Sequence, residues 1–251
     1  MCCSCQNCEI SFIELFNKLY AQFGPRNWWP AKTKFEVMVG AVLTQNTSWS
    51  NVEKAIANFG DNLCPFFIGN ASLEELIDII RPCGYYNQKA KTLKLLCQWF
   101  SSYDYKFENI KNMSVERLRD ELLKIKGIGK ETADSIILYA VEKPIFVVDN
   151  YTRRILQRLG MDLPAKYDEI RSLIENSFRS FISKQKNNSL CEIFIINKYL
   201  STAPLDELEC RIYNEFHALI VEHAKKYCTK KPDCYNCFLN IDCHYKDICS
   251  D

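Results

Sequence analysis

The amino-acid sequence predicts an all-α protein. Apolar residues recur three or four positions apart along most of the 251 residues, which places them on one face of a helix. Residues typical of helix N-termini come directly before several of these stretches. Only residues 145–148, Ile-Phe-Val-Val, have the composition of a strand, and so short a run could equally be a buried linker. The chain is 47% apolar, which is enough for the core of one or two domains.

The first half of the chain contains the clearest helix starts. Residues 11–14 and 33–36 both have the form of a capping box, and Ser72 and Ser114 are further N-cap candidates. Glycine, proline and polar residues interrupt the apolar pattern between these stretches. We expect helices over residues 12–20, 35–43, 52–59, 73–80, 90–100 and 115–125.

The second half continues the same helical spacing. Apolar residues at 133, 136, 137, 140 and 141 follow the i, i+3, i+4, i+7, i+8 pattern. Four more stretches with this spacing follow Pro144. We expect helices over residues 133–141, 151–159, 167–181, 190–199 and 210–227.

Composition excludes several classes of protein. No run approaches the roughly 20 apolar residues that a membrane-spanning helix needs, so we expect no membrane partner. The first residues lack the basic and apolar segments of a secretory signal, which predicts an intracellular protein. Its 14 cysteines are then expected as thiols or metal ligands rather than disulfides. The net charge of +1 gives no global sign of a nucleic-acid partner, so any such sign must be local.

One local sign lies between the helices expected at 115–125 and 133–141. The turn Gly127-Ile128-Gly129 is flanked by Lys124, Lys126 and Lys130. Glycines let a backbone approach a ligand closely, and the amides at the start of the second helix favour a phosphate. Such contacts position DNA without reading its sequence. An ordinary helical hairpin with a solvated lysine face explains the same residues.

This turn and the segment after it resemble the helix-hairpin-helix of the endonuclease III superfamily of DNA glycosylases. Residues 143–154, Lys-Pro-Ile-Phe-Val-Val-Asp-Asn-Tyr-Thr-Arg-Arg, match the family's loop and place Asp149 at its catalytic aspartate. The resemblance spans about residues 10–245. It implies a six-helix barrel over 31–140, with the helix-hairpin-helix at about 115–142. It also implies a second helical lobe, formed by 1–30 and 141–251, that carries a cluster loop at 228–243.

Asp149 ends an apolar run and precedes an arginine-rich helix, so a helix N-cap explains it as well as catalysis does. The two roles are compatible, because a capping carboxylate near the positive end of a helix stays ionised. An ionised carboxylate beside the sugar stabilises the positive charge that develops as a glycosidic bond breaks. The target base must first be flipped out of the duplex.

The residue at 131 distinguishes two reaction types within the family. In bifunctional members of the family that this chain resembles, the matching residue is a lysine. That lysine attacks the sugar as a Schiff-base nucleophile and leads to strand cleavage. Here Glu131 occupies that position, and a carboxylate cannot form an imine. We therefore expect a monofunctional enzyme that uses water and leaves an abasic site.

Tryptophans mark a candidate base pocket. Trp28 and Trp29 precede the helix expected at 35–43, and Trp49 follows the polar break at 44–47. With residues 40–47 and 84–90, they resemble the 3-methyladenine DNA glycosylase III branch, in which aromatics at these positions form the pocket. Alkylated purines are cationic, and aromatic rings attract cations. For each tryptophan alone, packing in the core is the simpler explanation.

Further DNA contacts are expected from neighbouring polar residues. Gln45 and Asn46 are candidates for wedging into the gap left by the flipped base or for contacting the opposite strand, although a turn or a helix cap explains both. In the hairpin, the resemblance assigns DNA binding to Lys126, Gly127, Ile128, Gly129 and Lys130. Tyr85, Tyr86, Asn87 and Lys89 are further candidates for the DNA backbone, unless they form a solvated loop.

Four cysteines lie within 16 residues near the end of the chain, at Cys228, Cys234, Cys237 and Cys243. Structural zinc sites usually have two close-spaced pairs, whereas only Cys234 and Cys237 are paired here. Four cysteines in a short loop can hold a [4Fe–4S] cluster. The family's spacing is similar, with a first gap one residue longer. We expect the cluster; zinc and free thiols are the alternatives.

The sequence thus predicts a base-excision-repair glycosylase that acts, as a monomer, on double-stranded DNA containing damaged bases. Alkylated purines such as 3-methyladenine are the expected targets. One alternative is a bifunctional endonuclease III-like glycosylase and lyase for oxidised pyrimidines, or a monofunctional enzyme with another specificity, such as a mismatched base. Another is an iron–sulfur module that binds DNA without catalysis, and a third is a zinc-stabilised helical scaffold without a nucleic-acid partner.

Overall fold

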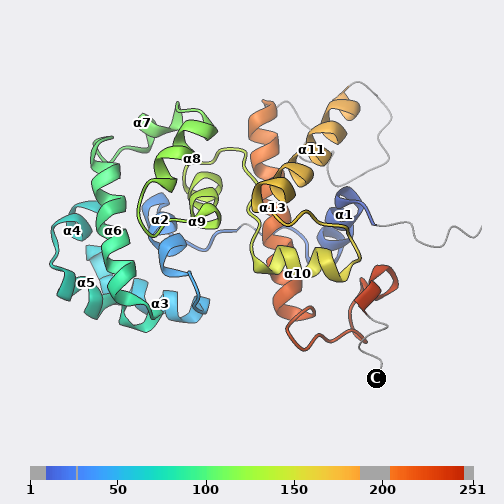
Figure 1. Ribbon diagram of the computed structural model, residues 1–251, viewed down its shortest axis with the longest axis horizontal. Coiled ribbons are helices and arrows are strands. Elements are labelled where there is room, and N and C mark those ends of the chain that lie inside the picture. Colours follow the sequence, from blue (N-terminus) through green and yellow to red (C-terminus); the bar gives the residue numbers. More distant parts are fainter. Residues whose placement is uncertain (1–9, 27, 187–203, 246–251) are drawn as a thin grey trace, which may run out of the picture. The chain divides into compact units, whose positions relative to one another are not determined.

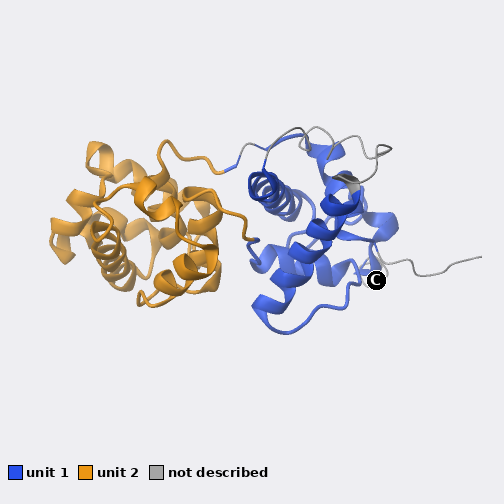
Figure 2. Cartoon of the chain, turned by 90° about the horizontal axis from the view of Figure 1, so that it is seen from above, with its two compact units in different colours: residues 1–28, 146–251 blue, residues 29–145 orange. Residues whose placement is uncertain are grey.

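The computed structural model of the chain describes residues 10–26, 28–186 and 204–245, and it confirms the all-α fold class (Figure 1). No strand occurs in these three ranges. The chain forms two compact units, one of residues 29–145 and one that combines residues 1–28 with 146–251 (Figure 2). None of the described helices is long and apolar enough to cross a membrane.

The unit of residues 29–145 is built from short helices around a buried one. The buried helix, α2 (Lys34–Leu43), lies against α6, α9 and η3. The apolar residues of α2 are buried and form the centre of the unit. The other helices are α3 (Trp49–Phe59), η1 (Gly60–Asn62), α4 (Pro65–Asn70), α5 (Leu73–Ile80), η2 (Arg81–Cys83), α6 (Tyr86–Ser101), α7 (Phe107–Lys111), α8 (Val115–Leu123), α9 (Lys130–Ser135) and η3 (Ile136–Ala140).

Side-chain caps define many of these helix starts. The Ser72 and Ser114 hydroxyls accept bonds from the backbone three residues later, as the sequence predicts. The capping box expected at 33–36 is only half formed. The Thr33 hydroxyl accepts from the Glu36 amide, but the Glu36 carboxylate bonds the amide of Lys32 instead of that of Thr33. The helix still starts where the pattern predicts.

The segment expected as a single helix over 133–141 changes its winding. After α9, residues 136–140 form a π-helical turn, η3, in which the Val141 amide bonds the Ile136 carbonyl five residues back. A π-turn adds one residue to the helical repeat and alters the direction of the side chains that follow. The spacing of apolar residues could not reveal this, because all five residues of the turn are buried.

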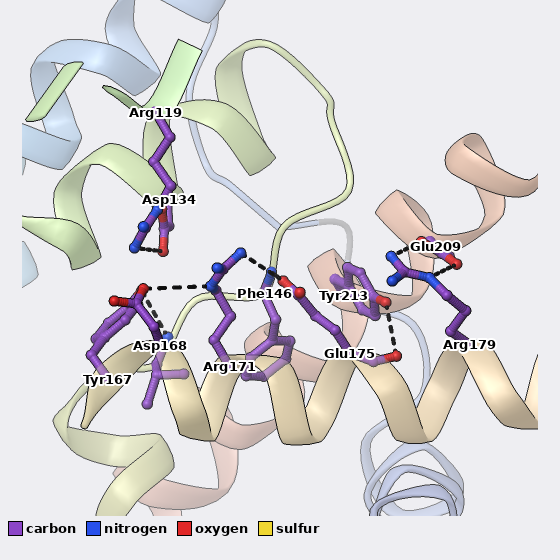
Figure 3. Close-up of polar contacts among 11 residues, drawn as sticks. Arg119, Asp134, Phe146, Tyr167, Asp168, Arg171, Glu175, Arg179, Glu209 and Tyr213 are labelled. Carbon is purple, nitrogen blue, oxygen red and sulfur yellow. Dashed lines mark hydrogen bonds and ion pairs between the residues drawn. The ribbon is translucent and has the colours of Figure 1, made fainter. Parts of the chain in front are cut away.

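The strand-like run at 145–148 is a buried linker without a sheet partner. The Phe146 amide donates to the Glu175 carboxylate at 2.8 Å, and the Val148 amide donates to the Tyr167 hydroxyl at 3.2 Å (Figure 3). Side chains thus satisfy two donors that a neighbouring strand would otherwise bind. This linker fixes the backbone just ahead of Asp149.

The second unit packs long helices around an aromatic core. Its helices are α1 (Phe12–Phe23), α10 (Asn150–Arg158), α11 (Tyr167–Lys186), α13 (Leu205–Lys226) and η4 (Asn240–Asp242). The rings of Phe16, Phe178 and Phe216, from α1, α11 and α13, contact one another with centroids 5.2–6.0 Å apart. A capping box at Ser11 starts α1, as predicted. The helix expected at 190–199 lies outside the described residues.

An ion pair and a hydrogen bond join α11 to α13 beside this core. The Arg179 guanidinium makes two bonds of 3.0 Å to the buried carboxylate of Glu209 (Figure 3). The Tyr213 hydroxyl donates to the Glu175 carbonyl at 3.3 Å. Two parallel bonds from a guanidinium fix both distance and rotation. They hold α13 in register along α11.

Candidate functional site

The turn between α8 and α9 depends on Gly127. Its φ is +96°, in the left-handed region, and a Cβ there would lie 2.0 Å from the Thr92 hydroxyl oxygen. That hydroxyl in turn donates to the Lys126 carbonyl at 3.1 Å. Ile128 is buried and anchors the turn in the core. Position 127 therefore tolerates no side chain, whereas a Cβ on Gly129 would meet nothing within 4 Å.

The two helices of the hairpin are locked together by a buried ion pair. Arg119 on α8 donates to Asp134 on α9 through Nε at 2.6 Å and Nη2 at 3.2 Å, and the Asp134 side chain is fully buried (Figure 3). Lys124, Lys126 and Lys130 are all exposed on the outside of the turn. The sequence predicts this clustering of positive charge, which the rigid turn holds in place.

Gln45 and Asn46 lie beside this turn with different roles. The Gln45 side-chain nitrogen donates to the Gly127 carbonyl at 3.0 Å and to the Thr132 hydroxyl at 2.9 Å. Asn46 is exposed and has a φ of +52°. The side-chain nitrogen of Gln45 thus braces the hairpin, while Asn46 projects outward. Both residues line a groove of about 1160 Å³ that also includes Lys126.

The expectation that Lys89 contacts the DNA backbone is wrong. Its side chain is only 3% exposed, and its ammonium group donates to the carbonyls of Leu43 and Cys83 at 2.9 and 2.8 Å. These carbonyls lie at the ends of α2 and η2, where a positive charge is favoured. Lys89 therefore fastens helix ends inside the unit. Tyr85, by contrast, is 66% exposed.

Two of the three candidate pocket tryptophans lie together in the unit of residues 29–145. The rings of Trp29 and Trp49 meet edge to face, with centroids 5.4 Å apart. Tyr139, from the π-turn, contacts Trp29 at 5.1 Å and extends this cluster. No role was predicted for Tyr139, which lies outside the apolar spacing at residues 133, 136, 137, 140 and 141. Trp28 belongs to the other unit, where the Lys225 ammonium lies 5.2 Å from its ring centroid.

Asp149 caps α10 and is held from two elements. Its Oδ1 accepts from the Thr152 amide at 2.7 Å and from the Thr152 hydroxyl at 2.8 Å. Its Oδ2 lies 3.5 Å from Nε2 of His217 on α13, and 12% of the Asp149 side chain is exposed. Burial raises the pKa of this carboxyl, but the His217 contact and the Thr152 bonds outweigh burial, so the net pKa is below its ordinary value. The capping role is confirmed, and the cap keeps the carboxylate charged.

His217 is a residue that the sequence analysis missed. It lies 68 positions after Asp149, within an apolar stretch of α13 that reads as core. The side chain is indeed buried, and its ring packs edge-on against Phe146. The chain contains only three histidines, so a histidine in the middle of an apolar helix is the one signal that could have marked it.

Glu131 lies in the first turn of α9 and is exposed. Its carbonyl accepts from the Ser135 hydroxyl at 2.7 Å, a bond that belongs to the helix itself. The carboxylate therefore emerges next to the hairpin turn.

The four C-terminal cysteines line one small cavity, together with Arg158 and His223. Its volume of about 20 Å³ has room for one water. Among the residues that the structure describes, no three His, Cys, Asp or Glu side chains are already arranged as metal ligands. The residue types nevertheless fit a thiolate-bound centre, because four cysteines line the same small cavity: Cys228, Cys234, Cys237 and Cys243.

Arginines of α10 fasten this cysteine segment. Arg154 donates to the Cys228 carbonyl at 2.9 Å. Arg158 lies 3.2 Å from the Cys228 sulfur, and its own carbonyl accepts from the Cys243 thiol at 3.3 Å. Burial lowers the pKa of His223, which faces the same cavity, to about 4. The helix that Asp149 starts therefore carries the cysteine segment at its other end.

Comparisons with known proteins agree with this arrangement. Residues 39–180 match the family described as HhH-GPD superfamily base excision DNA repair protein. A protein of Methanocaldococcus jannaschii, whose name marks it as a candidate DNA repair glycosylase, is 42% identical over 92% of this chain and 96% of its own length. Endonuclease III of Sulfolobus acidocaldarius is 26% identical over 84% of this chain and 82% of its own length.

A solved structure supports the same relationship. The 3-methyladenine DNA glycosylase MagIII of H. pylori, bound to 1,N6-ethenoadenine, superposes with a TM-score of 0.69 and 32% identity. The match covers 86% of this chain and 98% of that protein. The resemblance inferred from the hairpin and the segment at 143–154 is thus confirmed at the level of family and fold. The chain belongs to the HhH-GPD superfamily of base excision DNA repair glycosylases.

Proposed function

We propose that this protein is a monofunctional DNA glycosylase that hydrolyses the N-glycosidic bond of alkylated bases of the 3-methyladenine type. The observation that carries the proposal is the Asp149 carboxylate, which is nearly buried yet kept ionised by its cap and by His217. A fixed negative charge of this kind stabilises the oxocarbenium-like sugar formed as the base leaves. The partner is double-stranded DNA containing a damaged base, bound by a monomer.

The hairpin is the proposed phosphate-binding element. Lys126 and Lys130 are exposed beside the rigid turn, and Gly129 leaves its backbone open to a ligand. These contacts hold the DNA in register without selecting a sequence. Asn46, exposed next to the turn, is the proposed wedge that fills the gap behind a flipped base.

The aromatic cluster is the proposed base pocket. Trp29 and Trp49 contact each other, and Tyr139 adds a third ring. Aromatic faces attract a cationic base more strongly than a neutral one, which favours alkylated purines. The likeness to the H. pylori enzyme, whose name specifies 3-methyladenine, supports this substrate class. Trp28 is proposed as a further pocket residue.

Glu131 supports the assignment of a monofunctional reaction. A carboxylate has no nitrogen that could form an imine with the sugar, so water is the proposed nucleophile. The product is an abasic site in an intact strand. The similarity to endonuclease III favours one alternative function, that of a glycosylase and lyase for oxidised pyrimidines.

The cysteine segment is the proposed binding site of a [4Fe–4S] cluster. Cys228, Cys234, Cys237 and Cys243 would supply one thiolate to each iron. When bound, the cluster would link the four cysteines and so stabilise the fold of residues 228–243. Arg154 and Arg158 then join this segment to α10.

The test is base release from a panel of damaged duplexes, with the wild-type protein and Asp149→Asn. We expect release of 3-methyladenine-type bases by the wild type and strong loss in the variant. Borohydride added to the same reactions traps any imine between the protein and the sugar. A trapped adduct would reject the monofunctional reaction, and equal release by the variant would reject the role of Asp149.

A further inference from the structure

The two oxygens of Asp149 have separate partners. Oδ1 accepts both bonds from Thr152, so its lone pairs are directed into α10. Oδ2 is left for contacts outside the helix, and Nε2 of His217 lies 3.5 Å away. Capping α10 requires only the first oxygen. The contact with His217 therefore serves something other than the start of the helix.

His217 is held firmly in place. Its side chain is 6% exposed, and the Phe146 ring packs against it with centroids 6.2 Å apart and the planes at 83°. Phe146 is itself fixed, because its amide donates to the Glu175 carboxylate. The helix that carries His217, α13, packs directly against α10. The imidazole is thus a rigid group with little freedom to turn away from Asp149.

We propose that His217 is a positioning residue for the Asp149 carboxylate. In this proposal Nε2–H, 3.5 Å from Oδ2, donates to it, while Thr152 holds Oδ1, so the plane of the carboxylate is fixed from two helices. An ionised carboxylate oxygen has two lone pairs, and this bond uses only one of them. The second remains available to face the reacting sugar or the attacking water. The inference rests on the proposed role of Asp149 in base release.

A charge consequence follows from the same geometry. A hydrogen bond to the ionised form favours that form, so His217 helps to keep Asp149 deprotonated. The other groups that bond this carboxylate, the amide and hydroxyl of Thr152, do not titrate in this range. Loss of the imidazole should therefore raise the pKa of Asp149, while the two bonds from Thr152 remain.

The kinetic test compares His217→Leu with His217→Gln. The glutamine retains an N–H donor near the Nε2 position, whereas the leucine fills space without one. We expect the leucine variant to release base about 10²-fold more slowly in single turnovers, with unchanged affinity for DNA. The glutamine variant should recover most of the rate. The acid limb of the leucine variant's pH–rate profile should move to higher pH, because protonated Asp149 is inactive.

Ile220→Val is the matched control. It truncates a buried side chain on the same helix, so it changes packing in α13 without removing a hydrogen-bond donor. We expect its pH–rate profile to coincide with that of the wild type. If Ile220→Val slowed release as much as His217→Leu, or if the glutamine recovered nothing, His217 would have only a structural role.

A titration that needs no activity completes the test. Carbon-13 NMR of aspartate-labelled protein, with the Asp149 signal assigned from Asp149→Asn, gives the pKa of this carboxyl directly. We expect a pKa below the ordinary aspartate value in the wild type and a higher one in His217→Leu. An unchanged value overturns the inference. Absence of base release by the wild type would reject the proposed function instead, and the titration would still decide the role of His217.

Discussion

Asp149 combines a folding role with the proposed chemical one by using different oxygens. The sequence predicts two roles for this residue, a helix cap and a catalytic group, and the structure confirms the cap. The cap contributes on the order of 1 kcal/mol to stability. It also supports the second role, since the bonds from Thr152 stabilise the ionised carboxylate. A single residue can thus be constrained by stability and by chemistry together.

At position 131, one substitution tests the proposed choice between two reactions. Glu131→Lys places an amine at the position where the resemblance to bifunctional members of the family implies a nucleophilic lysine. Glu131 is exposed at the start of α9, so a lysine there avoids burial of its charge. We expect the variant to form a borohydride-trapped adduct with abasic DNA, because an amine forms an imine with the opened sugar. Gel electrophoresis of the adduct measures this.

Glu131→Gln is the control for that experiment, since it removes the charge without adding an amine. We expect it to form no adduct. An adduct with the wild-type protein would show that another lysine acts as nucleophile. A lysine variant without any adduct would mean that position 131 lies away from the sugar.

At the scale of elements, the hairpin shows how a short turn is made rigid. Gly127 adopts a left-handed conformation against Thr92, and Gln45 bonds the turn from α2's end. The Arg119–Asp134 pair fixes α8 to α9. Breaking a buried pair by removing one partner typically costs about 3–5 kcal/mol. The turn is therefore held from three directions, which suits an element that has to meet DNA phosphates at a fixed distance.

The two glycines of this turn provide a matched pair of variants. Gly127→Ala forces a side chain into the left-handed region and against Thr92, so we expect a stability loss of about 1–3 kcal/mol or more. Gly129→Ala meets no protein atom within 4 Å and should leave the melting temperature nearly unchanged. If Gly129 faces the backbone of DNA, its variant should still bind duplex DNA more weakly. Equal DNA affinity of Gly129→Ala and wild type would contradict the proposed interface.

The cysteine segment makes a prediction about metal content. We expect the purified wild-type protein to contain about four irons per chain. Cys237→Ser should lose iron, because it removes one of the four proposed ligands. Cys64→Ser is the control, since Cys64 lies in the unit of residues 29–145. Elemental analysis that found about one zinc and no iron would replace the cluster by a zinc site.

At the scale of the whole molecule, the sequence predicts local structure better than it predicts contacts between residues far apart in the chain. The fold class and most helix starts follow from apolar spacing and N-caps, as Ser72 and Ser114 show. The contact between Asp149 and His217 could not be predicted, because it joins residues far apart in the sequence. The burial of Lys89 was missed for a related reason. Its partners are backbone carbonyls, which carry no signature in the sequence.

The π-turn shows a further limit of pattern analysis. Residues 136–140 are buried on all sides, so their periodicity does not distinguish an α-turn from a π-turn. The change in winding decides where Tyr139 points, and this ring joins the Trp29–Trp49 cluster. The composition of a candidate pocket thus depended on backbone geometry that only the folded chain reveals.

In the proposed reaction, an ionised Asp149 drives base release by water and leaves the DNA strand intact. The most direct test is a single-turnover reaction on a duplex with one 3-methyladenine-type base, analysed on denaturing gels with and without alkali. We expect the wild-type protein to yield strand breaks only after alkaline treatment, and Asp149→Asn to yield almost none. Breaks without alkali, or the same yield from both proteins, would contradict the proposed reaction.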